Sequence, residues 1–222
     1  MKQYCELLKK TKLFKGIKDE EIIIMLNCLG ASKKTYKKNE VVFSMGSEIY
    51  SIGLVLNGKL EIAREDFWGN KSMISILQKG DIFGEAYAFT NNAPFWASVA
   101  TLTDASVLFL KANKVINTCS KSCSFHSELI NNLVSVIAHR NLKLNEKVAH
   151  MSERSIRRKV LSYLSNEAKR ANNDKFKIAF NRQQLADYLS VDRSALSNEL
   201  SKLRNEGILN FERNSFELIE NK

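Results

Sequence analysis

The sequence predicts an α+β fold in which a small antiparallel β domain precedes a long helix and a C-terminal winged helix-turn-helix. Apolar residues recur at helical spacing near the N-terminus, alternate with period two between about residues 40 and 110, and then return to helical spacing. No Gly or Pro occurs from Lys111 to Glu206, so this stretch must hold several helices. The last residues alternate again around a turn, which predicts a closing hairpin.

Length and composition fit an ordinary folded protein of two modules. For 222 residues we expect two modules, a β-rich one at 1–118 and the winged helix-turn-helix at 151–222, joined by a helix at 119–150. The 44% hydrophobic and 26% charged residues match globular proteins. The first residues lack the apolar core of a signal peptide, and no apolar run reaches the roughly 18 residues that span a bilayer. We therefore expect a cytoplasmic protein without a membrane partner.

The charge balance is compatible with a nucleic-acid partner but does not identify one. A formal net charge of +10 suits a polyanion, and a generally basic surface explains it almost as well. After residue 110, 20 Lys and Arg stand against 12 Asp and Glu, and this excess is not confined to the last module. The four cysteines show no repeated short spacing, so we expect free thiols rather than a disulfide framework.

The first half of the chain predicts short helices followed by short strands. Residues 2–29 carry helical spacing interrupted by Lys15-Gly16, which predicts one or two short helices. Six segments rich in β-branched and aromatic residues are predicted as strands: 40–44, 50–56, 59–65, 71–78, 95–101 and 104–110. Asn57-Gly58 is a strong two-residue hairpin signal between two of them. Strands this short and close predict a small antiparallel sandwich or barrel.

An apolar stripe marks the next element, a helix at about 122–150. Apart from the adjacent pair Val136 and Ile137, successive members are three, four or seven residues apart: Phe125, Leu129, Leu133, Val136, Ile137, Leu144, Val148 and Met151. Such a helix would extend about 42 Å, more than the small β domain can cover. We therefore expect the stripe to pack against its copy in a homodimer formed through residues 119–150. The alternative is a helix that lies on its own β domain.

Residues 180–209 are the most informative part of the chain. Asn181 can cap one helix and Asp192 a second, and a four-residue turn joins the two. The inward positions of the two helices are apolar: Leu185, Tyr188, Leu189, Leu196, Leu200 and Leu203. Ala186 is small enough for a close crossing, and Ser190 stands where the turn requires a positive φ. This pattern predicts a helix-turn-helix, followed by a hairpin wing with its turn at Arg213-Asn214.

A helix-turn-helix inserts its second helix into the major groove N-terminus first, so the polar residues outside the apolar stripe should face DNA. Arginine can bond guanine, asparagine can bond adenine, and serine can bond a base or a phosphate. Side chains and amides at the start of the first helix can hold a backbone phosphate. The predicted DNA-binding residues are Asn181, Arg182, Gln183, Asp192, Arg193, Ser194, Ser197 and Asn198. The alternative is a helical pair with solvated polar faces in an unrelated α-domain.

The segment RQQLADYLSVDRSALSNELSKLRNEGIL, Gly46, Asn57-Gly58 and the run Gly80-Asp81-Ile82-Phe83-Gly84-Glu85 resemble the Crp/Fnr family of bacterial regulators. The resemblance covers essentially the whole chain. It implies an N-terminal double-stranded β-roll, jelly-roll-like and of the cyclic-nucleotide-binding type, before the winged helix-turn-helix. It also implies a homodimer on a palindromic double-stranded DNA site, a possible small-molecule effector or redox event in the β-roll, and RNA polymerase as a partner if the protein activates transcription.

The recognition helix matches the family unevenly. Arg193 stands at the family's first recognition-helix arginine, whereas the glutamate that usually follows is Ser194 and the second arginine is Asn198. The resemblance therefore implies a half-site that differs from the best-known one of the family.

The expected effector pocket departs from the family in its phosphate site. In cyclic-AMP-binding members, a loop from Phe-Gly-Glu to Arg-Ser holds the nucleotide; here Phe95 and Trp96 occupy the Arg-Ser positions. A phosphate would lose its charge-assisted partner there, which argues against cyclic AMP. The pocket residues expected from the resemblance are Gly84, Glu85, Ala86, Phe95, Trp96, Leu144 and Asn145. Either the pocket takes a non-phosphorylated, partly aromatic or apolar ligand, or Phe95 and Trp96 fill it.

Metal and redox sites have weak support. An iron–sulfur cluster needs about four thiolates with several closely spaced; Cys5 and Cys28 stand alone in the N-terminal region, so such a cluster is not expected. Cys119, Cys123 and His126 share one helical face and are weak candidate ligands for zinc or haem, although core packing explains such residues as well. The alternative function is therefore an effector-binding or redox/haem-sensing module in which DNA binding is secondary.

No pattern supports an enzyme. The chain has no P-loop, no Gly-rich dinucleotide turn after a strand and no Ser or Cys nucleophile signature. His139 and His150 lack a paired nucleophile and are expected at the surface or in the dimer seam.

Overall fold

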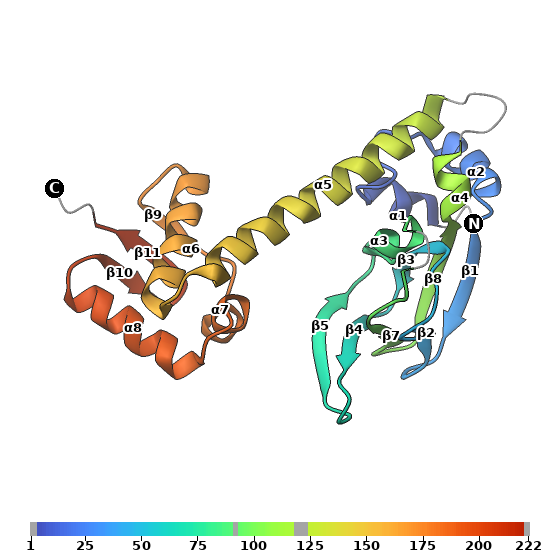
Figure 1. Cartoon of the computed structure of the whole chain (residues 1–222). Coiled ribbons are helices and arrows are strands. Elements are labelled where there is room, and N and C mark those ends of the chain that lie inside the picture. Colours follow the sequence, from blue (N-terminus) through green and yellow to red (C-terminus); the bar gives the residue numbers. More distant parts are fainter. Residues whose placement is uncertain (1–3, 91–92, 118–123, 220–222) are drawn as a thin grey trace. The chain divides into compact units, whose positions relative to one another are not determined.

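The computed structural model describes residues 4–90, 93–117 and 124–219, and the chain divides into two compact units, 1–138 and 139–222. The dividing point lies inside α5 (Ser124–Ser152), the long yellow-green helix of Figure 1, so this helix belongs partly to each unit. The expected α+β class is confirmed. None of the helices in the described ranges is both long and apolar enough to span a membrane.

Two antiparallel sheets form the centre of the first unit. Within the described residues their strand orders are β1-β8-β3-β6 and β2-β7-β4-β5. The strands are β1 (Ser32–Tyr36), β2 (Val41–Phe43), β3 (Ser51–Asn57), β4 (Leu60–Glu65), β5 (Lys71–Leu77), β6 (Ile82–Phe83), β7 (Ser98–Thr101) and β8 (Ala105–Lys111). Val55 and Val107 from one sheet and Leu60 and Val99 from the other share a buried cluster. The expected antiparallel sandwich is therefore confirmed, and its two sheets meet in this apolar cluster.

Four short helices accompany the sheets, and the first half of α5 packs with them. They are α1 (Cys5–Lys10), α2 (Asp19–Cys28), α3 (Glu85–Ala88) and α4 (Ala112–Ile116). Leu129, Leu133 and Val136 of α5 are buried in one cluster with side chains of α1, α2, β3 and β8. The expectation that the whole apolar stripe faces a second subunit is therefore wrong for the N-terminal half of α5, because those residues complete the core of their own unit.

Two strands of the first unit escaped the sequence pattern. β1 has the sequence SKKTY and is mostly exposed, yet it pairs with β8 over five residues, from Ser32 opposite Phe109 to Tyr36 opposite Ala105. An edge strand with one solvated face needs little apolar side chain, so no alternation marked it. β6 has only two residues, too few for any period to show.

The second unit is the predicted winged helix-turn-helix. Its elements after α5 are α6 (Ile156–Ala171), β9 (Lys175–Lys177), α7 (Arg182–Leu189), α8 (Arg193–Asn205), β10 (Leu209–Glu212) and β11 (Ser215–Leu218). The hairpin turns at Arg213-Asn214 as predicted, and β9 adds a third strand beside β11. Ala186, Leu196 and Leu200 are fully buried where the helices meet.

Ser190 adopts the positive φ that the motif requires. Its φ is 51°, and its N–H donates to the carbonyls of Ala186 and Asp187, which ends α7 in a left-handed residue. A non-glycine residue in this conformation costs about 1 kcal/mol, and the buried leucines on both sides hold it there. The predicted turn between the two helices is confirmed.

Candidate functional site

The start of α8 is fixed by its cap. Asp192 Oδ1 accepts hydrogen bonds from the backbone N–H of Ser194 at 2.8 Å and of Ala195 at 2.9 Å, and from the Ser194 hydroxyl at 2.5 Å. These bonds, the Ser194 hydroxyl first, hold the pKa of Asp192 below its usual range. The ionised carboxylate therefore stays on the helix N-terminus, where the macrodipole also favours it. In this role Asp192 positions the other predicted base readers.

One face of α8 is polar and exposed while the other is buried. Arg193, Ser194 and Asn198 are exposed and Ser197 is half-buried, whereas the leucines of the same helix lie in the core. The Ser197 hydroxyl donates to the carbonyl of Arg193 at 3.0 Å. Within the described part of the chain, the side chains of Arg193 and Asn198 have no hydrogen-bond or ion-pair partner. The structure thus brings the predicted readers together on one face with two long polar groups free to bind.

The N-terminus of α7 carries a capping box, of which the sequence analysis predicted only the Asn181 cap. Asn181 Oδ1 accepts from the N–H of Gln184, and Gln184 Oε1 accepts from the N–H of Asn181, each at 2.9 Å. Gln183 is exposed and donates to Asp187 Oδ1 at 2.8 Å. Asn181 and Gln183 are both exposed at this helix start, and their phosphate contacts stay a prediction.

Arg182 packs against aromatic side chains of the wing. Its guanidinium carbon lies 5.0 Å from the ring centre of Phe211 and 5.7 Å from that of Phe216, and it donates to the carbonyl of Arg213 at 3.4 Å. Burial lowers the pKa of Arg182. The structure adds a packing role for Arg182: its side chain joins the start of α7 to the wing, because a guanidinium gains most from an aromatic face when it is partly desolvated. Its phosphate contact stays a prediction.

Replacing Arg182 by alanine is expected to destabilise the second unit by about 1 kcal/mol, because two cation–π contacts are lost. Urea unfolding of the full chain measures the loss, and hydrogen exchange of the β10 and β11 amides locates it. Gln183→Ala, an exposed neighbour, is the control and should change stability by less than about 0.5 kcal/mol. Unchanged stability with weakened DNA binding would refute the packing role and favour the phosphate contact of Arg182.

Phe95 and Trp96, the two aromatic residues expected in the effector pocket, lie in different environments. Phe95 is 4% exposed, and its ring centre lies 5.0 Å from that of Tyr87 and 6.1 Å from that of Phe43. Trp96 is 49% exposed and has the guanidinium of Arg64 5.6 Å from its ring centre. Burial of Phe95 supports the interpretation that aromatic side chains fill the pocket. Trp96 does not support it, because its ring is half exposed and lies beside the guanidinium of Arg64.

The other expected pocket residues are divided between the two units of the chain. Gly84 has φ 78° and precedes α3, and a Cβ there would meet the ring of Phe43 at 2.9 Å, which explains the glycine. Glu85 is buried and Ala86 is exposed. Leu144 and Asn145 are exposed on the part of α5 that belongs to the second unit. Their place in the pocket stays a prediction.

The candidate metal ligands gain no support in the described ranges. Cys119 and Cys123 lie outside the described residues. His126 is buried with Nε2 3.0 Å from the carbonyl oxygen of Val115, so a backbone group already occupies this nitrogen. Elsewhere in the described residues, no three His, Cys, Asp or Glu side chains gather around a possible metal position.

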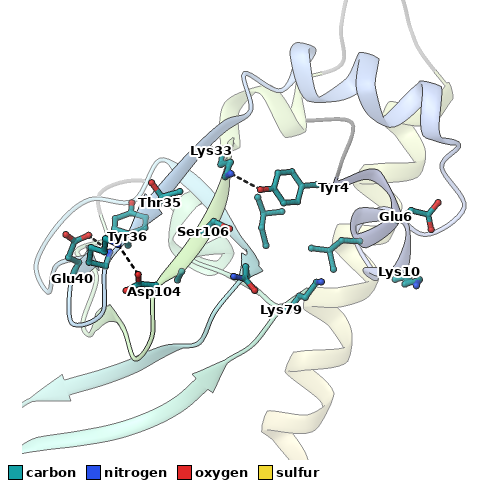
Figure 2. A pocket seen from close by; sticks show the side chains of 15 residues that line it. Tyr4, Glu6, Lys10, Lys33, Thr35, Tyr36, Glu40, Lys79, Asp104 and Ser106 are labelled. Carbon is teal, nitrogen blue, oxygen red and sulfur yellow. Dashed lines mark hydrogen bonds and ion pairs between the residues drawn. The ribbon is translucent and has the colours of Figure 1, made fainter.

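A surface pocket of about 830 Å³ on the first unit was missed by the sequence analysis (Figure 2). It lies where α1, β1, β3 and β8 come together, which no linear motif could show. Four lysines line it together with three carboxylates: Lys10, Lys33, Lys37, Lys79, Glu6, Glu40 and Asp104. Lys37 pairs with Asp104 at 3.1 Å and Lys33 donates to the Tyr4 hydroxyl at 2.7 Å. With four lysines and three carboxylates the formal charge of the lining is nearly balanced, so charge alone does not identify a class of ligand.

Comparisons with known proteins cover both units. The family model described as the cyclic nucleotide-binding domain matches residues 33–122, and that of the Crp-like helix-turn-helix domain matches 158–220. The chain is 23% identical over 184 residues to the Anaerobic regulatory protein of Bacillus subtilis, covering 82% of this chain and 77% of that protein. It is 22% identical over 202 residues to the Cyclic AMP receptor protein of Thermus thermophilus, covering 91% and 89%.

A solved structure shows the same fold. The crystal structure of the Thermus thermophilus Catabolite Activator Protein gives a TM-score of 0.51 at 21% identity, covering 95% of this chain and 94% of that one.

Proposed function

Since the chain belongs to the Crp/Fnr family of transcription regulators, we propose that it binds a palindromic double-stranded DNA site as a homodimer and that cyclic AMP is not its effector. Its relatives are regulators of transcription and not enzymes. One observation carries the proposal: α8 begins with a capped, exposed polar face opposite a row of fully buried leucines. A helix exposed in this way can enter the major groove without disturbing its own core.

The chemistry of that face defines the bases it reads. Arg193 can donate two bonds to guanine O6 and N7, and Asn198 can bond adenine N6 and N7. The Ser194 hydroxyl already donates its proton to Asp192, so its oxygen is left to accept. An acceptor at this position favours a base with an exocyclic amino group, adenine N6 or cytosine N4.

An exposed stripe of α5 supports the homodimer. It begins at Val134, between the buried Leu133 and Val136, and runs to the end of the helix with exposed side chains at heptad positions a and d: Val134, Ile137, Asn141, Leu144, Val148 and Met151. Apolar side chains at these spacings form the seam of a two-stranded coiled coil. The polar Asn141 at an a position favours a parallel, in-register pair, since only there does it meet its own copy.

Selection from a random DNA library tests the DNA-binding proposal. We expect inverted repeats to be enriched, and a gel-shift assay with the selected site at stated salt and with non-specific competitor should show a dimer-sized complex. Enrichment of no sequence over the starting library would contradict the proposal.

Isothermal titration with cyclic AMP is expected to show no binding tighter than about 100 µM. The physical reason is that Phe95 and Trp96 bring no positive charge to the phosphate position, and Phe95 is packed among aromatic rings. Adenosine, which lacks the phosphate, is the control ligand for the base and ribose. Cyclic AMP binding in the low micromolar range would overturn this part of the proposal.

A further inference from the structure

His150 is a buried polar residue near the end of α5, contrary to the expected surface or seam position. Its side chain is 2% exposed although the residues beside it, Ala149 and Met151, are exposed. It is enclosed by α6 and α7 of the same unit, on which Ser162, Tyr163 and Tyr188 lie. The imidazole therefore connects the end of the long helix to the helix-turn-helix.

Both ring nitrogens have partners. Nδ1 lies 2.9 Å from Ser162 Oγ, and Nε2 lies 3.4 Å from Asn166 Nδ2. Because the Asn166 amide nitrogen can only donate, Nε2 accepts, and the proton of the neutral ring sits on Nδ1 facing the Ser162 oxygen. A second proton on Nε2 would require the Asn166 amide to turn its oxygen toward the ring. The hydrogen bonds of this site as placed thus suit the neutral imidazole.

The rings around His150 are tightly grouped. The ring centre of His150 lies 5.8 Å from that of Tyr163 and 6.1 Å from that of Tyr188, and the two tyrosine rings are 5.4 Å apart. Tyr188 sits on α7 one residue before Leu189, which is fully buried, and two before Ser190, which begins the turn into α8. A displacement of His150 therefore acts on the element that sets the position of α8.

The charged neighbours do not compensate a charge on His150. On α5 they are Glu146 and Lys147, and on α6 Glu167 and Arg170. Arg170 pairs with Glu146 and, at 2.5 Å, with Glu167, while Lys147 lies 5.6 Å from the ring centre of Tyr188 on α7. Burial lowers the pKa of His150; Glu146 and Glu167 oppose this shift and Arg170 adds to it. The guanidinium of Arg170 pairs with both Glu146 and Glu167, and burial has the largest effect on the pKa of His150.

We propose that neutral His150 is a positioning residue that joins the end of α5 to the helix-turn-helix, and that its protonation loosens this joint and weakens DNA binding. The second part rests on the proposed DNA-binding function. Because burial lowers the pKa of His150 in the folded protein, the stability that neutral His150 contributes is complete above its unfolded-chain pKa of about 6.5. This stability is lost as the pH falls below about 6.5 and through the lower pKa of the folded protein.

Two measurements on the full chain test the proposal. The selected DNA site is titrated at about pH 7.5 and about pH 5.5 at constant ionic strength. We expect the wild-type affinity to fall about tenfold, whereas that of His150→Asn, which cannot take a proton, changes by less than about twofold. Urea unfolding at both pH values should show the same contrast in the stability of the second unit. His150→Gln replaces the asparagine variant if that variant does not fold.

His139→Asn is the matched control, since His139 is exposed on the same helix and should follow the wild type. An equal pH response of the wild type and His150→Asn in both measurements would overturn the proposal. If the wild type bound no DNA at either pH, the proposed function would fail. Urea unfolding alone would then test whether His150 joins the end of α5 to the helix-turn-helix. Equal pH dependence of the stability of the wild type and of His150→Asn would refute that role.

Discussion

Arg193→Ala is expected to weaken binding of the selected palindrome by about 2–6 kcal/mol, because the dimer presents two copies and each loses about 1–3 kcal/mol at one guanine. Arg193 is exposed at the first position of α8, beside the Asp192 cap, and its guanidinium has no partner within the described residues. Its removal should therefore leave the fold intact. Fluorescence anisotropy with the selected site and with single-base variants measures the loss and its position.

Base reading and simple charge loss can be separated. A base reader loses discrimination at one position of each half-site, while a phosphate contact weakens all sequences equally and reduces the salt dependence. Lys169→Ala removes one exposed positive charge elsewhere in the same unit and is the control. A uniform loss on every sequence after Arg193→Ala would refute the base-reading role.

The double variant Leu144→Asp, Val148→Asp is expected to be monomeric and to bind the palindrome about 10²–10⁴-fold more weakly. The two residues occupy neighbouring d and a positions of the exposed heptad, so in a parallel pair each carboxylate would face its own copy in a dry seam. Loss of the pairing removes the effective concentration that couples the two half-sites. Analytical ultracentrifugation gives the oligomeric state, and anisotropy gives the affinity.

Ser135→Asp adds one carboxylate of the same kind at an exposed position of α5 outside the heptad seam and is the control. Both proteins should keep the fold of the second unit, because Leu144 and Val148 are outside its buried cluster. A double variant that remains dimeric would show that the exposed stripe is not the dimer seam.

The helix-turn-helix could be predicted almost completely from local chemistry. Asn181 and Asp192 cap the helices because their side chains accept the first free N–H groups, and Ser190 takes the left-handed turn. These requirements act over three or four residues, so they are written in consecutive sequence. The role of Arg182 was not predictable in this way, because its aromatic partners Phe211 and Phe216 come from the wing about thirty residues later.

The long helix shows how a periodic pattern can hide two environments. The apolar stripe continues from Phe125 to Met151 at helical spacing, and nothing in that spacing marks a change. In the structure its first part completes the core of the first unit, whereas Leu144 and Val148 are exposed. Periodicity reports which residues share a face of a helix, and only the packed neighbours show what covers that face.

The α+β order of elements, the helix-turn-helix with its caps and the polar set at the start of α8 all follow from the amino-acid sequence. They do so because hydrogen-bonding and periodicity rules act along the chain over short distances. Tertiary structure alone decided that Phe95 is packed among rings, that Arg182 is held by the wing and that His150 is buried between α6 and α7. Burial depends on side chains that are distant in sequence, and the charge a histidine can carry depends on that burial.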